Sequence, residues 1–165
     1  MNENFEPYGA FQRLDRQSSG FLTPREFLNY LRDNGVASGV TEADCYYLVK
    51  FFDSDLDGQL HYPDFMQVVL PCSNPQLRAT ATQRPNQFCS KFSYLTLDVE
   101  KELADLFLHE IRLHRATEEL KQELESSKGY AKDAAWFAID DCRLGLVHKK
   151  NLERFFVGQR RKTTE

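Results

Sequence analysis

Apolar residues recur at helical spacing on both sides of three polar segments, each with a glycine near its centre. The apolar stripes on either side of a segment keep one phase, which predicts pairs of amphipathic helices joined by short loops. The stripe positions are Ala10, Phe11, Leu14, Phe27, Tyr30 and Leu31 for the first pair, Cys45, Leu48, Val49, Phe52, Phe65, Val68 and Val69 for the second, and Ala135, Trp136, Ile139, Leu152, Phe155 and Phe156 for the third. The pattern predicts an all-α fold.

One long helix is predicted over residues 98–128, which contain neither glycine nor proline and are rich in leucine and charged residues. Spacings that alternate between four and three residues give it a coiled-coil-like seam with two polar positions. The seam positions are Val99, Leu103, Leu106, Glu110, Leu113, Thr117, Leu120 and Leu124, and Phe107 and Ile111 widen the stripe near its start. The wide early stripe predicts packing on the chain's own C-terminal lobe. The narrow later seam, with Leu113, Leu120 and Leu124, predicts contact with another protein.

The second polar segment, residues 53–64, has carboxylates at positions 1, 3, 5 and 12 and glycine at position 6. A hard cation needs about six or seven oxygen ligands at roughly 2.4 Å, and alternate residues of a tight loop can supply them. The expected ligands are Asp53, Asp55, Asp57, Gln59 through its carbonyl, His61 through water, and Asp64. Position 12 is aspartate, one methylene shorter than the usual glutamate, which predicts weakened calcium affinity or a shift toward magnesium. His61 is equally interpreted as an exposed histidine without a role.

The first segment, residues 15–26, repeats this pattern with fewer charges. Its expected ligands are Asp15, Gln17, Ser19, Phe21 through its carbonyl, Thr23 and Glu26. Two carboxylates capture a divalent ion less tightly than four, so this loop either binds calcium weakly or is closed by its own hydrogen bonds. Leu22 and Leu60 occupy position 8 of their loops and are expected to pair in a short antiparallel ribbon.

The third segment, residues 140–151, keeps the central glycine and an apolar position 8 but not the ligands. Positions 3, 5 and 12 are Cys142, Leu144 and Asn151. The sequence therefore predicts a helix–loop–helix unit here that binds no calcium.

These loops resemble those of the EF-hand superfamily, which includes calmodulin, centrin and troponin C, over residues 5–70 and 129–157. The strings LPCSNPQLRATATQRP and VEKELADLFLHEIRLHRATEELKQEL, followed by a ligand-poor C-terminal hand, resemble EF-hand proteins of cilia and flagella. That resemblance implies a cytoskeletal location in the axoneme, with tubulin or other axonemal proteins as partners. The motifs and the composition together divide the chain into an EF-hand pair (1–70), a connector (71–97), a long helix (98–128), a degenerate hand (129–157) and a tail (158–165).

The connector and the tail are basic. Residues 71–97 hold Arg78, Arg84 and Lys91 and no acidic residue, and the tail holds Arg160, Arg161 and Lys162. The prolines of the connector predict an extended chain or short turns. It is interpreted either as a flexible tether or as a contact to an acidic partner surface. Residues 93–97 are β-prone and are the nearest candidate to pair with residues 146–148.

Composition excludes several classes of function. No apolar run approaches the roughly 20 residues that span a bilayer, the N-terminus lacks the features of an export signal, and three scattered cations per segment are too few for nucleic-acid binding. Four cysteines without CxxC spacing predict buried, reduced thiols and a cytoplasmic protein. No nucleophile elbow, Walker loop or dinucleotide-binding glycine pattern is present, so an enzyme is not expected.

Two functions remain. The first is a structural, non-enzymatic subunit of a cytoskeletal assembly, with calcium or magnesium in the second loop. The alternative is a calcium sensor that binds target helices when loaded with calcium. The chain has only two methionines, whereas grooves that accept many targets are rich in methionine, which favours a permanent and specific contact.

Overall fold

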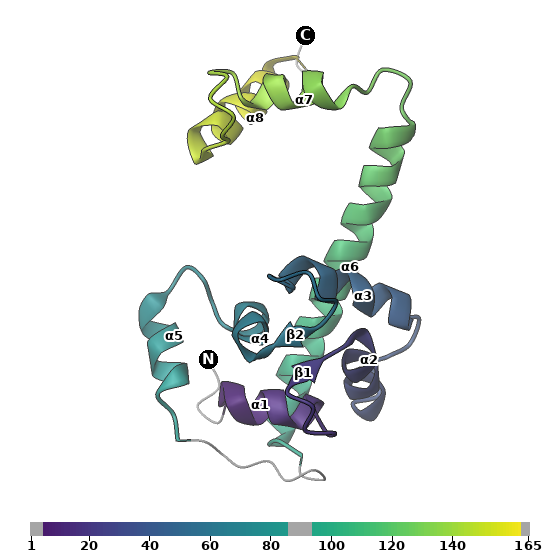
Figure 1. Cartoon of the computed structure of the whole chain (residues 1–165), viewed down its shortest axis with the longest axis vertical. Coiled ribbons are helices and arrows are strands. Elements are labelled where there is room, and N and C mark those ends of the chain that lie inside the picture. Colours follow the sequence, from purple (N-terminus) through teal and green to yellow (C-terminus); the bar gives the residue numbers. More distant parts are fainter. Residues whose placement is uncertain (1–4, 86–93, 163–165) are drawn as a thin grey trace. The chain divides into compact units, whose positions relative to one another are not determined.

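The computed structural model describes residues 5–85 and 94–162, with side chains up to residue 158. Helices dominate, which confirms the all-α prediction (Figure 1). The elements are α1 (Pro7–Leu14), β1 (Phe21–Leu22), α2 (Pro24–Asp33), α3 (Glu42–Phe52), β2 (Leu60–His61), α4 (Tyr62–Val69), α5 (Pro75–Thr82), α6 (Leu97–Ser126), α7 (Lys132–Ile139) and α8 (Lys149–Lys162). Among the described helices, none is both long and apolar enough to cross a membrane. The chain divides into two compact units, Met1–Thr117 and Glu118–Glu165.

Helices α1–α4 form two helix–loop–helix units, here called the N-terminal pair, and their starts are set by local chemistry. Thr23 and Glu26 cap α2, and Thr41 and Asp44 cap α3 in the same reciprocal way. Proline follows the cap of α2, where its missing N–H leaves no helical hydrogen bond unmade. The caps therefore begin each helix at the residue where the apolar stripe starts.

A two-stranded antiparallel ribbon joins the two loops of the pair. Leu22 of β1 lies opposite Leu60 of β2, and Phe21 lies opposite His61, which confirms the predicted pairing. Both leucines are fully buried. The ribbon joins the two helix–loop–helix units of the N-terminal pair into one lobe with a common core.

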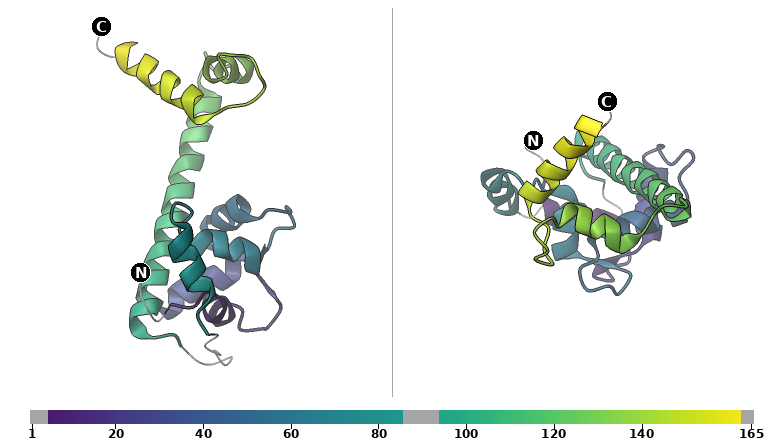
Figure 2. Two further views of the ribbon diagram at one scale, coloured as in Figure 1. Left: turned by 90° about the vertical axis from the view of Figure 1, so that its left-hand side faces the viewer. Right: turned by 90° about the horizontal axis from the view of Figure 1, so that it is seen from above.

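The first half of α6 packs on this N-terminal pair. Its buried residues are Val99, Glu100, Leu103, Ala104, Phe107, Leu108 and Ile111. Two views show this half of the helix alongside α1–α4 (Figures 1 and 2). The expectation that the wide early stripe packs on the C-terminal lobe is therefore wrong. The reason is that Phe27, Tyr30 and Phe65 of the pair leave an aromatic groove, which Phe107 fills.

The connector contains a helix, so the prediction of an extended chain or short turns is wrong for its first part. Pro75 begins α5, and the side chain of Asn74 caps the helix by accepting the N–H of Leu77 at 3.1 Å. Ala81 is completely buried and belongs to the main core. An N-cap, a proline at the first helical position and a buried apolar contact outweigh the polar composition of this segment.

The expected strand before α6 is absent from the described residues of that segment, and Ser93 lies outside the description. Leu97 already begins α6, and Leu95 donates its N–H to Glu100 Oε1 at 2.9 Å. Residues 146–148 form no strand either. The prediction of a ribbon between residues 93–97 and 146–148 is therefore wrong for the described residues, because the N–H of Leu95 is bonded to Glu100 and Leu97 is already helical.

In the second unit, α7 and α8 pack on each other across the third loop. Its only buried residues among those described are polar, Asp140 and Asn151. The cysteines also differ from expectation. Cys45 is buried in the core of the pair, but Cys72 and Cys142 are exposed, and Cys89 lies outside the described residues.

Candidate metal centre

The three loops share one backbone path. Position 4 of each loop has a positive φ, at Ser18 (54°), Leu56 (63°) and Arg143 (53°), and the glycine at position 6 does as well. In each loop the aspartate at position 1 accepts the N–H of that glycine at 2.8 Å. The side chain at position 12 accepts the N–H of position 9 in all three, at 2.9, 3.2 and 2.9 Å. The loops are one repeated structure and differ in the side chains they present.

The second loop gathers three metal-ligating side chains, Asp55, Asp57 and His61. One ligand atom from each lies within 4.8 Å of the other two. The Nε2 atom of His61 is 3.3 Å from Asp57 Oδ2, and this contact raises the pKa of His61. Sequence alone leaves the role of His61 open, whereas the structure places its ring within reach of an ion held by the two aspartates.

The two ends of the second loop are held by hydrogen bonds. Asp53, at the end of α3, accepts the N–H groups of Leu56 and Gly58, each at 2.8 Å. Burial acts to raise the pKa of Asp53, but these bonds outweigh burial and keep the pKa below its usual value. Asp64, in the first turn of α4, accepts the hydroxyl of Ser54 at 2.7 Å. Ser54 is a residue that the ligand pattern does not reveal, and its only sequence signal is a hydroxyl next to the first ligand.

The donor set of the second loop fits a hard divalent cation. Four carboxylates provide oxygen atoms, and a carboxylate that accepts one or two N–H bonds keeps further lone pairs for an ion. Gln59, the expected carbonyl ligand, donates its N–H to Asp57 Oδ1 at 2.8 Å and so belongs to the same turn. Oxygen ligands of this kind suit Ca²⁺ and Mg²⁺.

The expected ligands of the first loop are bonded to one another. Asp15 accepts the N–H and the hydroxyl of Ser19, both at 2.9 Å, and the same hydroxyl donates to the carbonyl of Phe21 at 3.0 Å. Glu26 accepts the N–H of Thr23 at 2.9 Å and its hydroxyl as well. An ion that enters this loop has to displace these hydrogen bonds. The loop offers the ion two carboxylates, whereas the second loop offers four.

A comparison with known families and proteins bears on these loops. The model of the "EF-hand domain pair" family matches residues 8–70. This segment is an EF-hand pair. "Calmodulin-like protein 2" of Arabidopsis thaliana is 32% identical over 60 residues, which are 36% of this chain and 40% of the relative. The rice protein "Probable calcium-binding protein CML28" is also 32% identical over 60 residues, 36% of this chain and 35% of the relative.

"Calcium-dependent protein kinase 34" of Arabidopsis thaliana is 32% identical to this chain over 74 residues. The match covers 43% of this chain and only 14% of the kinase. The chain thus spans well under half the length of the relatives it matches. No solved structure matches it.

The groove of the EF-hand pair is the place where such domains take up target helices, and here α6 lies in it. The ring of Phe107 is 5.1 Å from Phe27, 5.6 Å from Tyr30 and 6.3 Å from Phe65, measured between ring centroids. Phe107 is completely buried. The chain therefore fills its own groove with an aromatic anchor, a feature that the sequence pattern alone does not assign.

A buried ion pair holds the start of α6 against the EF-hand pair. Arg13 Nε of α1 donates to Glu100 Oε1 at 2.7 Å, and both side chains are almost fully buried. Asn34, which follows α2, donates to Glu100 Oε2 at 2.9 Å. Burial acts to raise the pKa of Glu100, but the bonds it accepts, first that from Asn34, outweigh burial and hold the pKa below its usual value.

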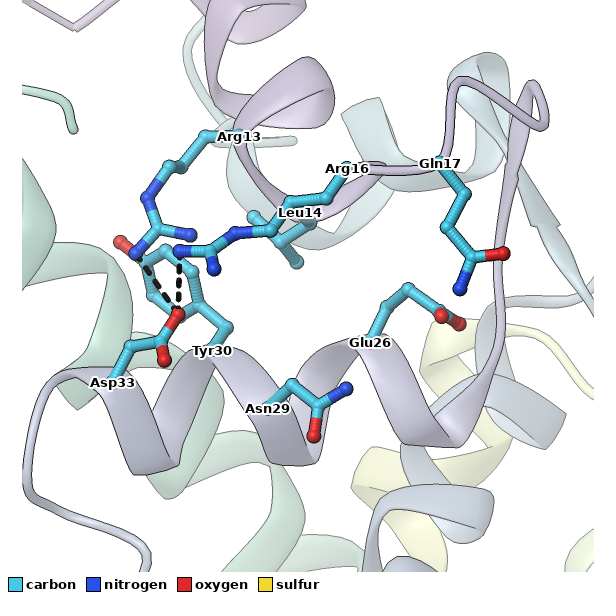
Figure 3. Close-up of a pocket in the computed structure, with 8 residues that line it drawn as sticks. All are labelled: Arg13, Leu14, Arg16, Gln17, Glu26, Asn29, Tyr30 and Asp33. Carbon is cyan, nitrogen blue, oxygen red and sulfur yellow. Dashed lines mark hydrogen bonds and ion pairs between the residues drawn. The ribbon is translucent and has the colours of Figure 1, made fainter. Parts of the chain in front are cut away.

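A small pocket of about 150 Å³ lies between α1 and α2 next to the first loop. Both arginines of its lining are paired: Arg13 and Arg16 reach Asp33, at 3.3 and 2.6 Å (Figure 3). Gln17 and Glu26, two expected ligands of the first loop, line its other end (Figure 3). The pocket therefore joins the first loop to the contacts that hold α6.

The third loop replaces ligands with protein contacts. Asn151, at position 12, donates to Asp141 Oδ1 at 2.9 Å, and Arg154 donates to the same oxygen at 2.6 Å. Cys142 and Leu144, at positions 3 and 5, are exposed and offer no oxygen ligands from their side chains. Within this unit, Arg154 is the charge partner of Asp141.

The residues expected to contact partners have different surroundings. Leu113, Leu120 and Leu124 are exposed on α6. Arg78 is half-buried on α5, and Arg84 donates to the backbone carbonyl of Phe5 within the chain. Arg160 and Arg161 belong to α8 beyond the described side chains, and Lys91 lies outside the described residues.

Proposed function

We propose that this protein is a non-enzymatic, divalent-ion-binding interaction protein whose EF-hand pair clasps its own helix α6. In this account calcium in the second loop stabilises the closed pair, and the exposed half of α6 and the C-terminal unit face protein partners. The observation that carries the proposal is the complete burial of Phe107 among the aromatic rings of the groove.

The choice of ion rests on the second loop. Its oxygen-rich donors favour calcium, and Asp64 in place of glutamate at position 12 makes magnesium a stronger competitor, because a shorter side chain reaches the ion less readily with both oxygens. The proposed ligands are Asp53, Asp55, Asp57, the Gln59 carbonyl and Asp64, with His61 bound directly or through water. This set is supported by the cluster of Asp55, Asp57 and His61. The first loop takes up calcium more weakly.

A calcium sensor is the second candidate. The observation that favours it is that α6 occupies the groove as a target helix does, so an external helix could exchange with it after calcium binding. The relatives named calmodulin-like and calcium-binding point the same way. Exchange has a cost, however, because it exposes Phe107 and leaves Arg13 and Glu100 without their buried partners.

The axonemal location and the tubulin partner stay predictions, supported by the ciliary resemblance of the sequence. Sedimentation with microtubules at low and high salt tests them, since contacts made by basic residues weaken as salt rises.

Calcium titration calorimetry tests the ion site. We expect the wild type to bind calcium and Asp57→Asn to bind it at least about tenfold more weakly, because one of four charged ligands is lost. The matched control is Asp105→Asn, which removes an exposed carboxylate on α6 and is expected to leave the affinity unchanged. Equal calcium affinity in wild type and Asp57→Asn would remove the second loop from the account.

A further inference from the structure

The C-terminal helix–loop–helix, residues 132–158, leaves a set of large apolar side chains in solvent. Trp136 and Phe137 of α7 and Leu152 and Phe156 of α8 are 40–60% exposed. Trp136, Leu152 and Phe156 lie in the stripes that define the helical phase of this unit, and Phe137 lies beside its stripe. A stripe that faces solvent in an isolated unit is an uncovered interface.

The EF-hand pair shows how the same positions are covered when two hands meet. Four residues before the loop stand Phe11, Val49 and Trp136, with exposed fractions of 4%, 0% and 43%. Directly after the loop stand Phe27, Phe65 and Leu152, with exposed fractions of 0%, 0% and 40%. The third hand thus exposes positions that the other two hands bury, partly against each other, as Phe11 does on Phe65, and partly against α6, as Phe27 does on Phe107.

The register of the existing ribbon identifies the occupant that fits. In the EF-hand pair, position 8 faces position 8 and position 7 faces position 9. This register has two-fold symmetry, so a hand can satisfy it with an identical copy of itself. In the third loop the corresponding residues are Leu146, Val147 and His148, which form no strand within the described chain.

The charges of the third hand also suit pairing with itself. In the EF-hand pair, the first helix of one hand packs on the second helix of the other, as α1 does on α4 and α2 on α3. The same arrangement places α7 of one copy against α8 of the other. Residues 129–141, around α7, hold three acidic residues and one basic residue, whereas α8 holds six basic residues and one acidic residue. Asp140 is buried in its own loop and Asp141 is paired with Arg154 of the same hand, so Asp133 is the acidic residue of α7 that can face the basic α8 of the second copy, once on each side of the two-fold axis.

We propose that the C-terminal helix–loop–helix pairs with the same segment of a second copy of this chain, forming a symmetric dimer in which Val147 faces Val147. The dimer gives the third hand a second hand to pair with, as in the lobe that α1–α4 form. Since the third loop lacks calcium ligands, the dimer forms with or without calcium, and its test is independent of the ion site proposed above.

Disulfide trapping tests the register in the full-length chain. Val147→Cys is made in a background in which Cys45, Cys72, Cys89 and Cys142 are serine. Directly opposed residues of an antiparallel ribbon bring their Cβ atoms to about 5 Å, close to disulfide geometry, whereas diagonal ones lie about 7 Å apart. We expect Val147→Cys to form covalent dimers under mild oxidation, and the matched His148→Cys chain to form them at least about tenfold more slowly. Equal or absent trapping in the two chains overturns the register.

Analytical ultracentrifugation tests the dimer itself, with Leu152→Asp against Leu77→Asp, a leucine of α5 that is exposed to the same degree, 39% against 40%. We expect the wild type to reach twice its mass of 19.2 kDa as concentration rises. Leu152→Asp should weaken association at least about tenfold, and Leu77→Asp should not. The emission of Trp136, the only tryptophan, should shift to shorter wavelength as the wild type associates. A monomer at all concentrations, or a dimer lost through Leu77→Asp and kept in Leu152→Asp, overturns the proposal.

Discussion

In the ion site proposed above, position 12 of the second loop controls how the ion is held. Asp64 is nearly buried and already accepts the hydroxyl of Ser54 and the N–H of His61. The carboxylate is therefore fixed at the start of α4 and must reach the ion with a side chain that is one methylene short. The hydroxyl of Ser54 offsets the short reach by orienting the carboxylate.

Asp64→Glu is expected to tighten calcium binding by about tenfold and to change magnesium affinity less, because glutamate can offer both oxygens to the larger ion. Calcium and magnesium titrations of the two proteins measure this. Ser54→Ala serves as the companion variant and should lower calcium affinity. A Glu variant that binds calcium no better than wild type would show that reach does not limit the site.

The buried contact of Glu100 with Arg13 makes the packing of α6 on the EF-hand pair depend on pH. Its pKa in the folded protein lies below its value in the unfolded chain, so protonation favours unfolding. Its contribution to the free energy of unfolding is complete above about pH 4.3, the unfolded value, and is lost as pH falls through the folded pKa.

Glu100→Gln is therefore expected to lower the stability at neutral pH by about 3 kcal/mol, because Arg13 loses its buried charge partner. Chemical denaturation between neutral and acid pH measures this. The difference between wild type and variant should shrink as the pH falls below about 4. A difference that is independent of pH would contradict the assignment of the charge to this contact.

At the scale of elements, the two halves of α6 have different surroundings. Its first half is buried against the EF-hand pair, whereas Leu113, Leu120 and Leu124 of the second half are exposed. The helical pattern and the loop chemistry are local, so the sequence predicts the helices, the shared loop path and the Leu22–Leu60 ribbon. The helical pattern does not show which of the two lobes the early stripe of α6 packs on. That choice depends on the shape of a groove built by residues far away in the sequence.

The same limit explains the other elements that sequence misses. The polar segment that contains α5 is helical because Asn74 caps its start and Ala81 is buried in the core. The pair of Arg13 with Glu100 joins residues 87 positions apart, and neither lies in a pattern that marks it as buried. The ligand candidates of the second loop follow from spacing, but the support that Ser54 gives to Asp64 depends on geometry.

Phe107→Ala is expected to lower the free energy of unfolding of the first unit by about 3–5 kcal/mol, because it empties the aromatic groove. Leu113→Ala, two turns later on an exposed position, should cost less than about 0.5 kcal/mol. Denaturant unfolding followed by circular dichroism measures both. Equal small effects would mean that α6 is not part of the core.

At the scale of the whole molecule, we propose an ion-binding lobe that is closed by α6 and exposed surfaces that meet partners. Because α6 covers the aromatic groove of the EF-hand pair, we assign partner contacts to the later seam of α6 and to the C-terminal unit. In a sensor, calcium uncovers the groove, whereas in the account proposed here calcium adds stability to a lobe that is already filled.

Amide hydrogen exchange of α6, measured with and without calcium, tests this claim most directly. The account predicts that residues 99–111 stay protected in both conditions and become more protected with calcium, while residues 113–124 exchange faster throughout. Loss of protection in residues 99–111 when calcium binds would contradict it and establish the pair as a sensor that releases its own helix.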